Sequence, residues 1–223
     1  MAHLLRLAHD WRMEIEGGVP AELIRDYLRP AVRAVPAAMA ARTKIRLIRV
    51  CPTLDPPEAS SRWRRSFEAA DIWLAADADP HDVAMELLIC VGQILWEELT
   101  GEERNQWLDR LRREIEAGVT GEIDEPALEA KARLLATAAA ARSLRRLEAY
   151  ARAAFGSTAA EYVHCLWHDV TLRSGPEHLP APWFRARLEL LRRWFPPNPG
   201  YRLFAATAQR GTGSEGASEA SPA

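Results

Sequence analysis

Apolar residues in the first part of the chain recur at helical spacing. Residues 2–16 carry them in a pattern that predicts an amphipathic helix ending at Gly17. These apolar positions are Leu4, Leu5, Ala8, Trp11 and Ile15. A second helix is predicted over residues 21–41, and the prolines inside it, Pro30 and Pro36, predict a kink or two shorter pieces.

Two short apolar segments that follow predict strands. The segment KIRLIRV, residues 44–50, is rich in β-branched residues, and DIWLAA, residues 71–76, is the second predicted strand. The segment CPTLDPPEAS, which lies between them, contains three prolines and predicts a loop. The sequence therefore predicts a small sheet near residues 44–76.

Helical patterns dominate the rest of the chain. Asp79 and Pro80 begin the first predicted helix, and Thr100 with Glu103 forms a capping box that begins the second. The predicted helices cover residues 80–99, 100–118, 124–155, 158–172 and 180–195. Residues 209–223 have nothing to bury, so they are predicted to be a disordered tail.

The predicted fold class is α+β and predominantly α-helical, with a small sheet packed by helices and a helical C-terminal half. We expect a single globular domain over residues 1–208, and a subdivision near residue 120 is the alternative. The apolar stripe of the last helix predicts core packing rather than a surface that stacks nucleic-acid bases. This stripe consists of Phe184, Leu188, Leu191 and Phe195.

Composition narrows the classes of function. The 223 residues are 48% hydrophobic and carry a formal net charge of −2, which favours neither nucleic acid nor an anionic membrane as a partner. No stretch reaches the roughly 18 apolar residues that span a bilayer. Cys51, Cys90 and Cys165 form no CxxC pair, and the N-terminus has no uninterrupted apolar run of signal-peptide length. We therefore expect a cytoplasmic protein.

The helix over residues 80–99 is apolar almost all round. Its polar residues share one stripe about 60° wide on a helical wheel. They are Asp82, Glu86, Gln93 and Glu97. A carboxylate in the middle of such a helix, as Glu86 is, needs a hydrogen-bond partner or a hydrated cavity. One interpretation is therefore a plain core helix that accommodates one carboxylate.

A second interpretation comes from a resemblance. Residues 85–89, Met-Glu-Leu-Leu-Ile, fall on the His-Glu-x-x-His pattern of zincin metallopeptidases, in which two histidines bind zinc and the glutamate activates water. In zincins the strands usually precede this helix, and one of them lines the substrate cleft. Gly92 stands where some zincins keep a glycine, and Glu129 resembles the third zinc ligand of the gluzincin branch.

The departure from the zincin pattern concerns both histidines, because Met85 and Ile89 occupy their positions. An alkyl chain has no donor atom, and a thioether is unsuited to catalytic zinc. The resemblance therefore implies a zincin-like pseudoenzyme in which Glu86 is vestigial. The corresponding function is a non-catalytic binding or scaffold module that holds a protein or peptide partner in a groove near Glu86.

A second set of residues could bind metal. Glu161, His164 and His168 lie within about 60° of one another on a helix, which would suit Zn²⁺ with a fourth ligand from elsewhere. That ligand would be His178, Asp169 or Asp82. The alternative function is therefore a metal-dependent hydrolase that uses His164 and His168.

The competing interpretation is a solvated polar face with a Glu161–His164 ion pair. A third interpretation is a nucleophilic thiol at Cys165 that a neighbouring histidine activates, but the sequence offers no group that would orient this histidine.

Overall fold

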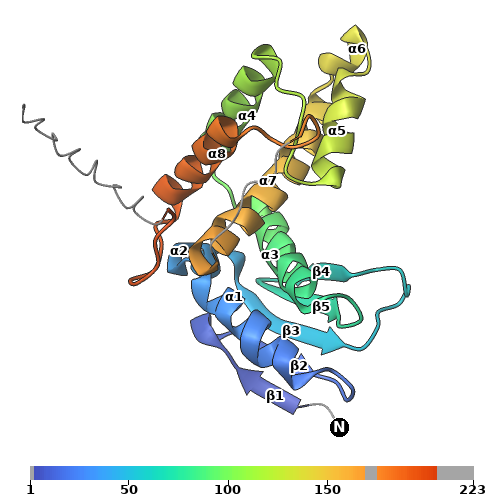
Figure 1. Ribbon diagram of the computed structural model, residues 1–223, viewed down its shortest axis with the longest axis vertical. Helices are drawn as coiled ribbons and strands as arrows, with labels where there is room; N and C mark the ends of the chain where they lie inside the picture. The colour runs from blue at the N-terminus through green and yellow to red at the C-terminus, as the bar shows by residue number, and fades with distance from the viewer. Residues whose placement is uncertain (1–2, 169–174, 205–223) are drawn as a thin grey trace, which may run out of the picture.

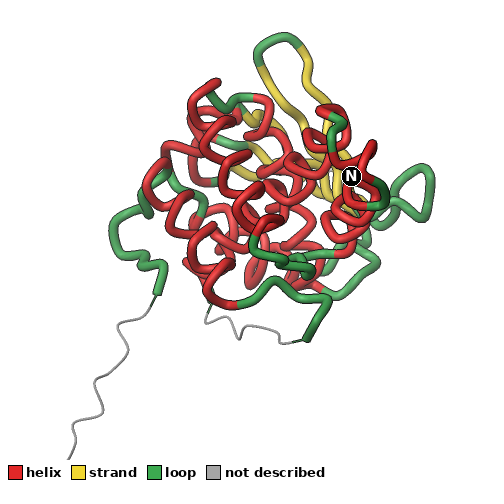
Figure 2. The backbone as a smooth tube through the Cα atoms, turned by 90° about the horizontal axis from the view of Figure 1, so that it is seen from above, coloured by secondary structure: helices red, strands yellow, loops and turns green. Residues whose placement is uncertain are grey.

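The computed structural model describes residues 3–168 and 175–204. They form an α+β fold that is mostly helical, as predicted, with one mixed sheet at one end of the molecule (Figure 1). Seen from above, the helices lie in front of the strands (Figure 2). The predicted disordered tail, residues 209–223, lies outside the described residues. No described helix has the length and apolar character required to cross a bilayer.

The sheet contains five strands among the described residues. Their order is β1 (His3–Arg6), β2 (Arg12–Ile15), β3 (Ile45–Cys51), β5 (Ala69–Ala75) and β4 (Ser61–Ser66). The three central strands are parallel, and both edge strands, β1 and β4, run antiparallel to their neighbours. The two predicted strands correspond to β3 and β5.

The helix predicted over residues 2–16 is wrong, because this segment forms the hairpin of β1 and β2. Between the strands, the short helix η1 (Ala8–Asp10) turns the chain with His9 and Asp10 at φ angles of 61° and 60°. Met13 pairs with Ile48 of β3 and is fully buried. Pairing with a distant strand outweighs the local helical spacing of the apolar residues.

Strand β4 was missed because its sequence, SRWRRS, is rich in arginine and resembles a loop. It pairs with β5 through Trp63 and Ile72, among others, and it forms one edge of the described sheet. Charged residues are common on edge strands, where they discourage aggregation with other chains. The strand propensity of its residues alone therefore gives little indication of such an edge strand.

The region predicted as a kinked helix forms three pieces. They are η2 (Leu23–Leu28), α1 (Arg29–Ala34) and α2 (Ala37–Thr43). Pro36 separates α1 from α2, whereas α1 continues directly from η2, so Pro30 lies inside a continuous helical stretch at the second position of α1. The predicted interruption is therefore confirmed.

The next two helices begin where their caps predicted. Helix α3 (Pro80–Glu97) is capped by Asp79, whose side chain accepts a 2.8 Å hydrogen bond from the backbone N–H of His81. Helix α4 (Gly101–Glu116) begins with the predicted capping box of Thr100 and Glu103. Local sequence signals determine both boundaries.

The long helix predicted over residues 124–155 is wrong. The chain forms α5 (Glu125–Leu135), α6 (Ala138–Ala141) and α7 (Leu144–Trp167), and the side chains of Thr137 and Ser143 cap the last two. The predicted start of the following helix, at Thr158, is also wrong. Thr158 lies inside α7, where its hydroxyl donates a 2.6 Å hydrogen bond to the carbonyl of Ala154. The end predicted at residue 172 lies outside the described residues.

Helix α8 (Ala181–Trp194) and its apolar stripe are as predicted. The stripe packs into the same core as α3 and α7. All four of its members, Phe184, Leu188, Leu191 and Phe195, are at most 5% exposed. Core packing is therefore confirmed for these residues.

Helices α3 and α7 pack closely against each other at Gly92. A Cβ atom added there would lie 2.6 Å from the carbonyl oxygen of Gly156 and 2.9 Å from the Cβ of Ala159. These distances leave no room for a side chain. Gly92 therefore has a packing role between the two helices.

A buried network of charges joins the helical half of the molecule. Arg187 on α8 is fully buried and donates to the carboxylates of Glu114 and Glu122, with the closest contact to Glu122 at 2.8 Å. Glu122 also accepts from Lys131 at 3.1 Å and from the hydroxyl of Tyr150. Burial alone would raise the pKa of Glu122, but attraction and hydrogen bonding by Arg187 outweigh burial and lower this pKa.

Candidate functional site

The polar edge of α3 faces the inner side of strand β4. Glu86 accepts a 2.6 Å hydrogen bond from the hydroxyl of Ser61, and Gln93 accepts a 2.8 Å hydrogen bond from the indole N–H of Trp63. One step further along, Arg65 forms an ion pair with Glu98. Alternate residues of β4 point to the same side, which is why these three can reach one helix. The partner that Glu86 requires is therefore on a strand that the sequence did not reveal.

A pocket of about 280 Å³ lies beside Glu86. Its lining residues are Ser60, Ala75, Ala78, Asp82, Val83, Met85 and Glu86. The walls are small and aliphatic, and two carboxylates stand among them. Met85 and Ile89, at the two histidine positions of the zincin pattern, both pack partly buried against the main core, and Met85 also lines this pocket.

Glu129 does not join Glu86. Its carboxylate forms an exposed ion pair with Arg133, one turn further along α5, at 2.5 Å. Helix α5 packs on α6 and α7 at the end of the molecule away from the sheet (Figure 1). The structure therefore does not bring together the two glutamates that the resemblance singled out.

The histidine cluster gains a member that the sequence did not indicate. His164 on α7 lies with its Nε2 atom 3.0 Å from Nε2 of His81, which is in the first turn of α3. Its other ring nitrogen, Nδ1, lies 3.1 Å from a carboxylate oxygen of Glu161. The imidazole of His168 lies next to both, with ring centroids 5.7 Å from His164 and 6.3 Å from His81. His81 is 83 positions from His164 in the sequence, so no spacing rule predicts the pair.

This arrangement differs from the predicted helical chelate. His164 is only 9% exposed, and the interpretation as a solvated face is therefore wrong for it, although its contact with Glu161 is present. His168 is the C-cap of α7: its backbone N–H still donates a 2.8 Å hydrogen bond to the carbonyl of His164, but its own backbone angles are extended rather than helical. Both ring nitrogens of His164 already have contacts within the protein.

Within residues 3–168 and 175–204, no three His, Cys, Asp or Glu side chains are grouped so as to hold a metal ion. Of the suggested fourth ligands, Asp82 lines the pocket beside Glu86, and His178 contacts Glu177 at 3.3 Å. Asp169 lies outside the described residues. Zinc bound by Glu161, His164 and His168 stays a prediction.

Glu86 and the histidine cluster belong to different faces of α3. Glu86 is five positions after His81, which places their side chains about 140° apart around the helix. Glu86 points toward β4, and His81 points toward α7. Two separate candidate sites therefore exist, one on each side of α3.

The thiol of Cys165 is a poor nucleophile in this fold. Burial, followed by the nearby charge of Glu161, raises its pKa to about 12. A thiol with such a pKa is protonated near neutral pH, and the thiolate is the reactive form. The structure therefore argues against a catalytic role for Cys165.

Comparison of the chain with models of protein families, with curated proteins and with solved structures finds no match.

Proposed function

We propose that this protein is a non-catalytic, zincin-like binding module that holds an extended peptide segment of a partner protein against β4, beside Glu86. The observation that carries the proposal is the hydrogen bond between Ser61 and Glu86, which ties the carboxylate to an edge strand. In zincins a strand that precedes the helix lines the substrate cleft, and we assign that role here to β4, which precedes α3. We place this activity in the cytoplasm because all three cysteines are free.

The open edge of β4 suits the addition of a further strand. It pairs with β5 along one side, and an edge strand presents unpaired backbone N–H and C=O groups along the other. An extended peptide can pair with such an edge, so that its main chain contributes affinity and its alternate side chains enter pockets. The zincin-like position of β4 and its free edge thus support the same mode of binding.

The pocket beside Glu86 defines the side chain that we expect at the centre of the peptide. The aliphatic walls formed by Ala75, Val83 and Met85 suit the methylene stem of a long side chain. The carboxylates of Asp82 and Glu86 suit a cation at its end. We therefore propose that the bound segment contains a lysine or an arginine.

The test uses a fluorescein-labelled nonapeptide, Thr-Val-Thr-Val-Lys-Val-Thr-Val-Thr, in fluorescence anisotropy with the full chain. We expect saturable binding, weakened about tenfold when the lysine of the peptide is replaced by methionine or Glu86 by glutamine. Glu86→Gln keeps an acceptor for Ser61, so its fold is maintained. The matched control is Glu129→Gln, on the distant helix α5, which should bind the peptide as the native chain does.

Two results would contradict the proposal. Equal binding by Glu86→Gln and Glu129→Gln would exclude the pocket, and full binding of a peptide that is N-methylated at alternate residues would exclude strand addition. Proteolysis of a generic substrate such as casein that disappears in Glu86→Gln would overturn the non-catalytic assignment.

A metal-dependent hydrolase built on His164 and His168 is the second candidate. The observation that favours it is the third imidazole, His81, beside the two that the sequence indicated. Metal analysis of the purified chain tests it. Stoichiometric zinc that is lost in His164→Ala would support this candidate, and metal-free protein that takes up none from added Zn²⁺ would end it.

A further inference from the structure

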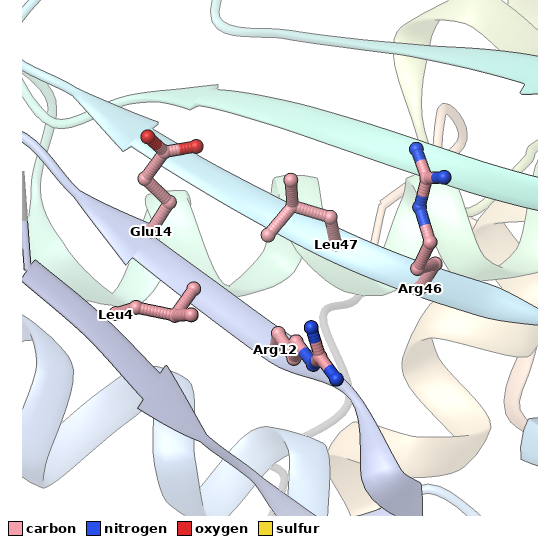
Figure 3. A pocket seen from close by; sticks show the side chains of 5 residues that line it. All are labelled: Leu4, Arg12, Glu14, Arg46 and Leu47. Carbon is pink, nitrogen blue, oxygen red and sulfur yellow. The ribbon is translucent and has the colours of Figure 1, made fainter.

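The side of the sheet that faces away from the helices, here called the outer sheet face, is composed of two cross-strand rows. The first row consists of Leu4, Glu14, Arg49, Trp73 and Arg62. The second consists of Arg6, Arg12, Leu47, Asp71 and Arg64, with Arg46 beside it at a bulge. Alternation along each strand sends these side chains outward, while Met13, Ile48 and Ile72 point into the core. Figure 3 shows part of this face, with the helices behind it.

Positive charge is concentrated on the outer sheet face. Its two rows and the bulge hold six arginines and only two carboxylates, whereas the whole chain has a formal net charge of −2. The excess of positive charge on this face is therefore balanced by a more negative remainder of the protein. Such an asymmetry steers anionic partners toward the positive side.

Two of these six arginines remain available to a partner, since Arg6 is paired with Asp10, and Arg62 contacts Trp73 and the carbonyl of Asp55. Arg46 and Arg49 are used inside the face, because they pair with Asp71 at 2.7 Å and Glu14 at 2.9 Å. Arg12 and Arg64 are exposed and form no ion pair with any described residue. Their guanidinium groups lie in the same cross-strand row and can each accept a carboxylate in a bidentate manner.

A shallow pocket of about 300 Å³ lies on the same face, between β1, β2 and β3. It is lined by Leu4, Arg12, Glu14, Arg46 and Leu47 (Figure 3). Leu4 is 56% exposed, so its side chain is accessible to a partner. The pocket thus combines two leucines with the guanidinium of Arg12, which is unpaired among the described residues, while the carboxylate of Glu14 in its lining is paired with Arg49. This suits an aliphatic side chain with a carboxylate next to it.

The contacts of Trp73 favour a protein partner over nucleic acid. Arg49 and Arg62 are its direct neighbours on the two flanking strands, with guanidinium carbons 5.1 and 5.3 Å from the ring centroid. An indole held between two side chains is a poor platform for the base stacking on which single-strand recognition depends.

We propose that the outer sheet face binds an acidic, leucine-containing segment of a partner protein. Its carboxylates pair with Arg12 and Arg64, and its aliphatic side chain enters the pocket between Leu4 and Leu47. This surface is separate from the groove beside Glu86, so it does not depend on the function proposed above. Binding here would let the protein hold a second segment on the opposite side of its sheet.

The experiment measures binding of the full chain to a fluorescein-labelled dodecapeptide, four repeats of Asp-Glu-Leu, by fluorescence anisotropy. We expect saturable binding that weakens as salt is added and that is lost with the matched peptide of Asn-Gln-Leu repeats. The double variant Arg12→Ala/Arg64→Ala should bind about tenfold more weakly. Its control is Arg142→Ala/Arg145→Ala, which removes two exposed arginines from the helical half and should bind as the native chain does.

Three further results decide the proposal. Glu86→Gln should bind the acidic peptide normally, which keeps this test independent of the groove. Equal affinity of the two arginine double variants would overturn the proposal, because it would show that position on the sheet is irrelevant. Tighter binding of a labelled twelve-nucleotide oligo-dT than of the acidic peptide would also overturn it, in favour of nucleic acid. Circular dichroism of both double variants confirms that their folds are equal.

Discussion

Ser61 on β4 donates a 2.6 Å hydrogen bond to Glu86 on α3, across 25 positions of sequence. A carboxylate in the middle of an otherwise apolar helix is costly unless a donor accompanies it, and Ser61 is that donor. The contact joins the edge strand to the central helix at the pocket for which we propose peptide binding. It also gives Glu86 a structural role that needs no metal.

Replacing Ser61 with alanine should destabilise the protein by about 2 kcal/mol, because Glu86 would keep its partly buried position without this donor. Ser61→Thr should restore most of the loss. Urea unfolding of the two variants, alone and combined with Glu86→Met, which removes the acceptor of the Ser61 hydroxyl, measures the effect. Strictly additive losses in the double-mutant cycle would show that the two side chains do not interact.

Gly92→Ala should destabilise the fold by about 1–3 kcal/mol, since its Cβ would meet the backbone of α7. The control is Gly101→Ala at the start of α4, where an added Cβ would have no atom within 4 Å. Thermal unfolding of both variants measures the difference. Equal melting temperatures would mean that α3 and α7 are less tightly packed than described here.

Acid should destabilise the native protein through Glu122. A glutamate whose pKa is lowered by folding adds stability that is complete above its ordinary value of 4.5 and is lost as the pH falls through the folded value. Urea unfolding at a series of pH values between 7 and 3 should show this loss. A flat profile would contradict the strong coupling of Glu122 to Arg187.

Arg187→Met should cost about 3–5 kcal/mol at pH 7, because it removes the main partner of two buried carboxylates. Lowering the pH should then harm the variant less than the native chain, since its unpaired carboxylates gain by protonation. Arg185→Met on the same helix, whose guanidinium contacts the ring of Phe204, is the control with an ordinary surface arginine. The difference between the two pH profiles isolates the buried network.

All three cysteines should react slowly with iodoacetamide in the native protein. Burial raises the pKa of Cys51 to about 11 and that of Cys90 and Cys165 to about 12, which leaves little thiolate at pH 7.5. Intact-mass spectrometry over time, with urea-denatured protein as reference, measures the rate. Rapid modification of Cys165 alone would restore the thiol-nucleophile interpretation.

The sequence by itself determined the features that depend on neighbouring residues. The starts of α3 and α4 follow from their caps, and the interruption at Pro36 follows from proline chemistry. The apolar stripe of α8 could also be found in this way, because helical periodicity records which side is buried. The lack of an imidazole at Met85 and Ile89 is likewise a property of the sequence.

Only the tertiary structure decided which distant groups meet. Strand β2 is stabilised by pairing with β3, β4 by pairing with β5, and β1 joins the sheet through β2. No local window contains these contributions, so the local patterns misled. The contacts of Ser61 with Glu86 and of His81 with His164 join elements 25 and 83 positions apart. Hydrogen bonds and ion pairs depend on separation in space rather than in sequence, and for that reason the site, the buried charges and the outer sheet face emerge only when the chain is folded.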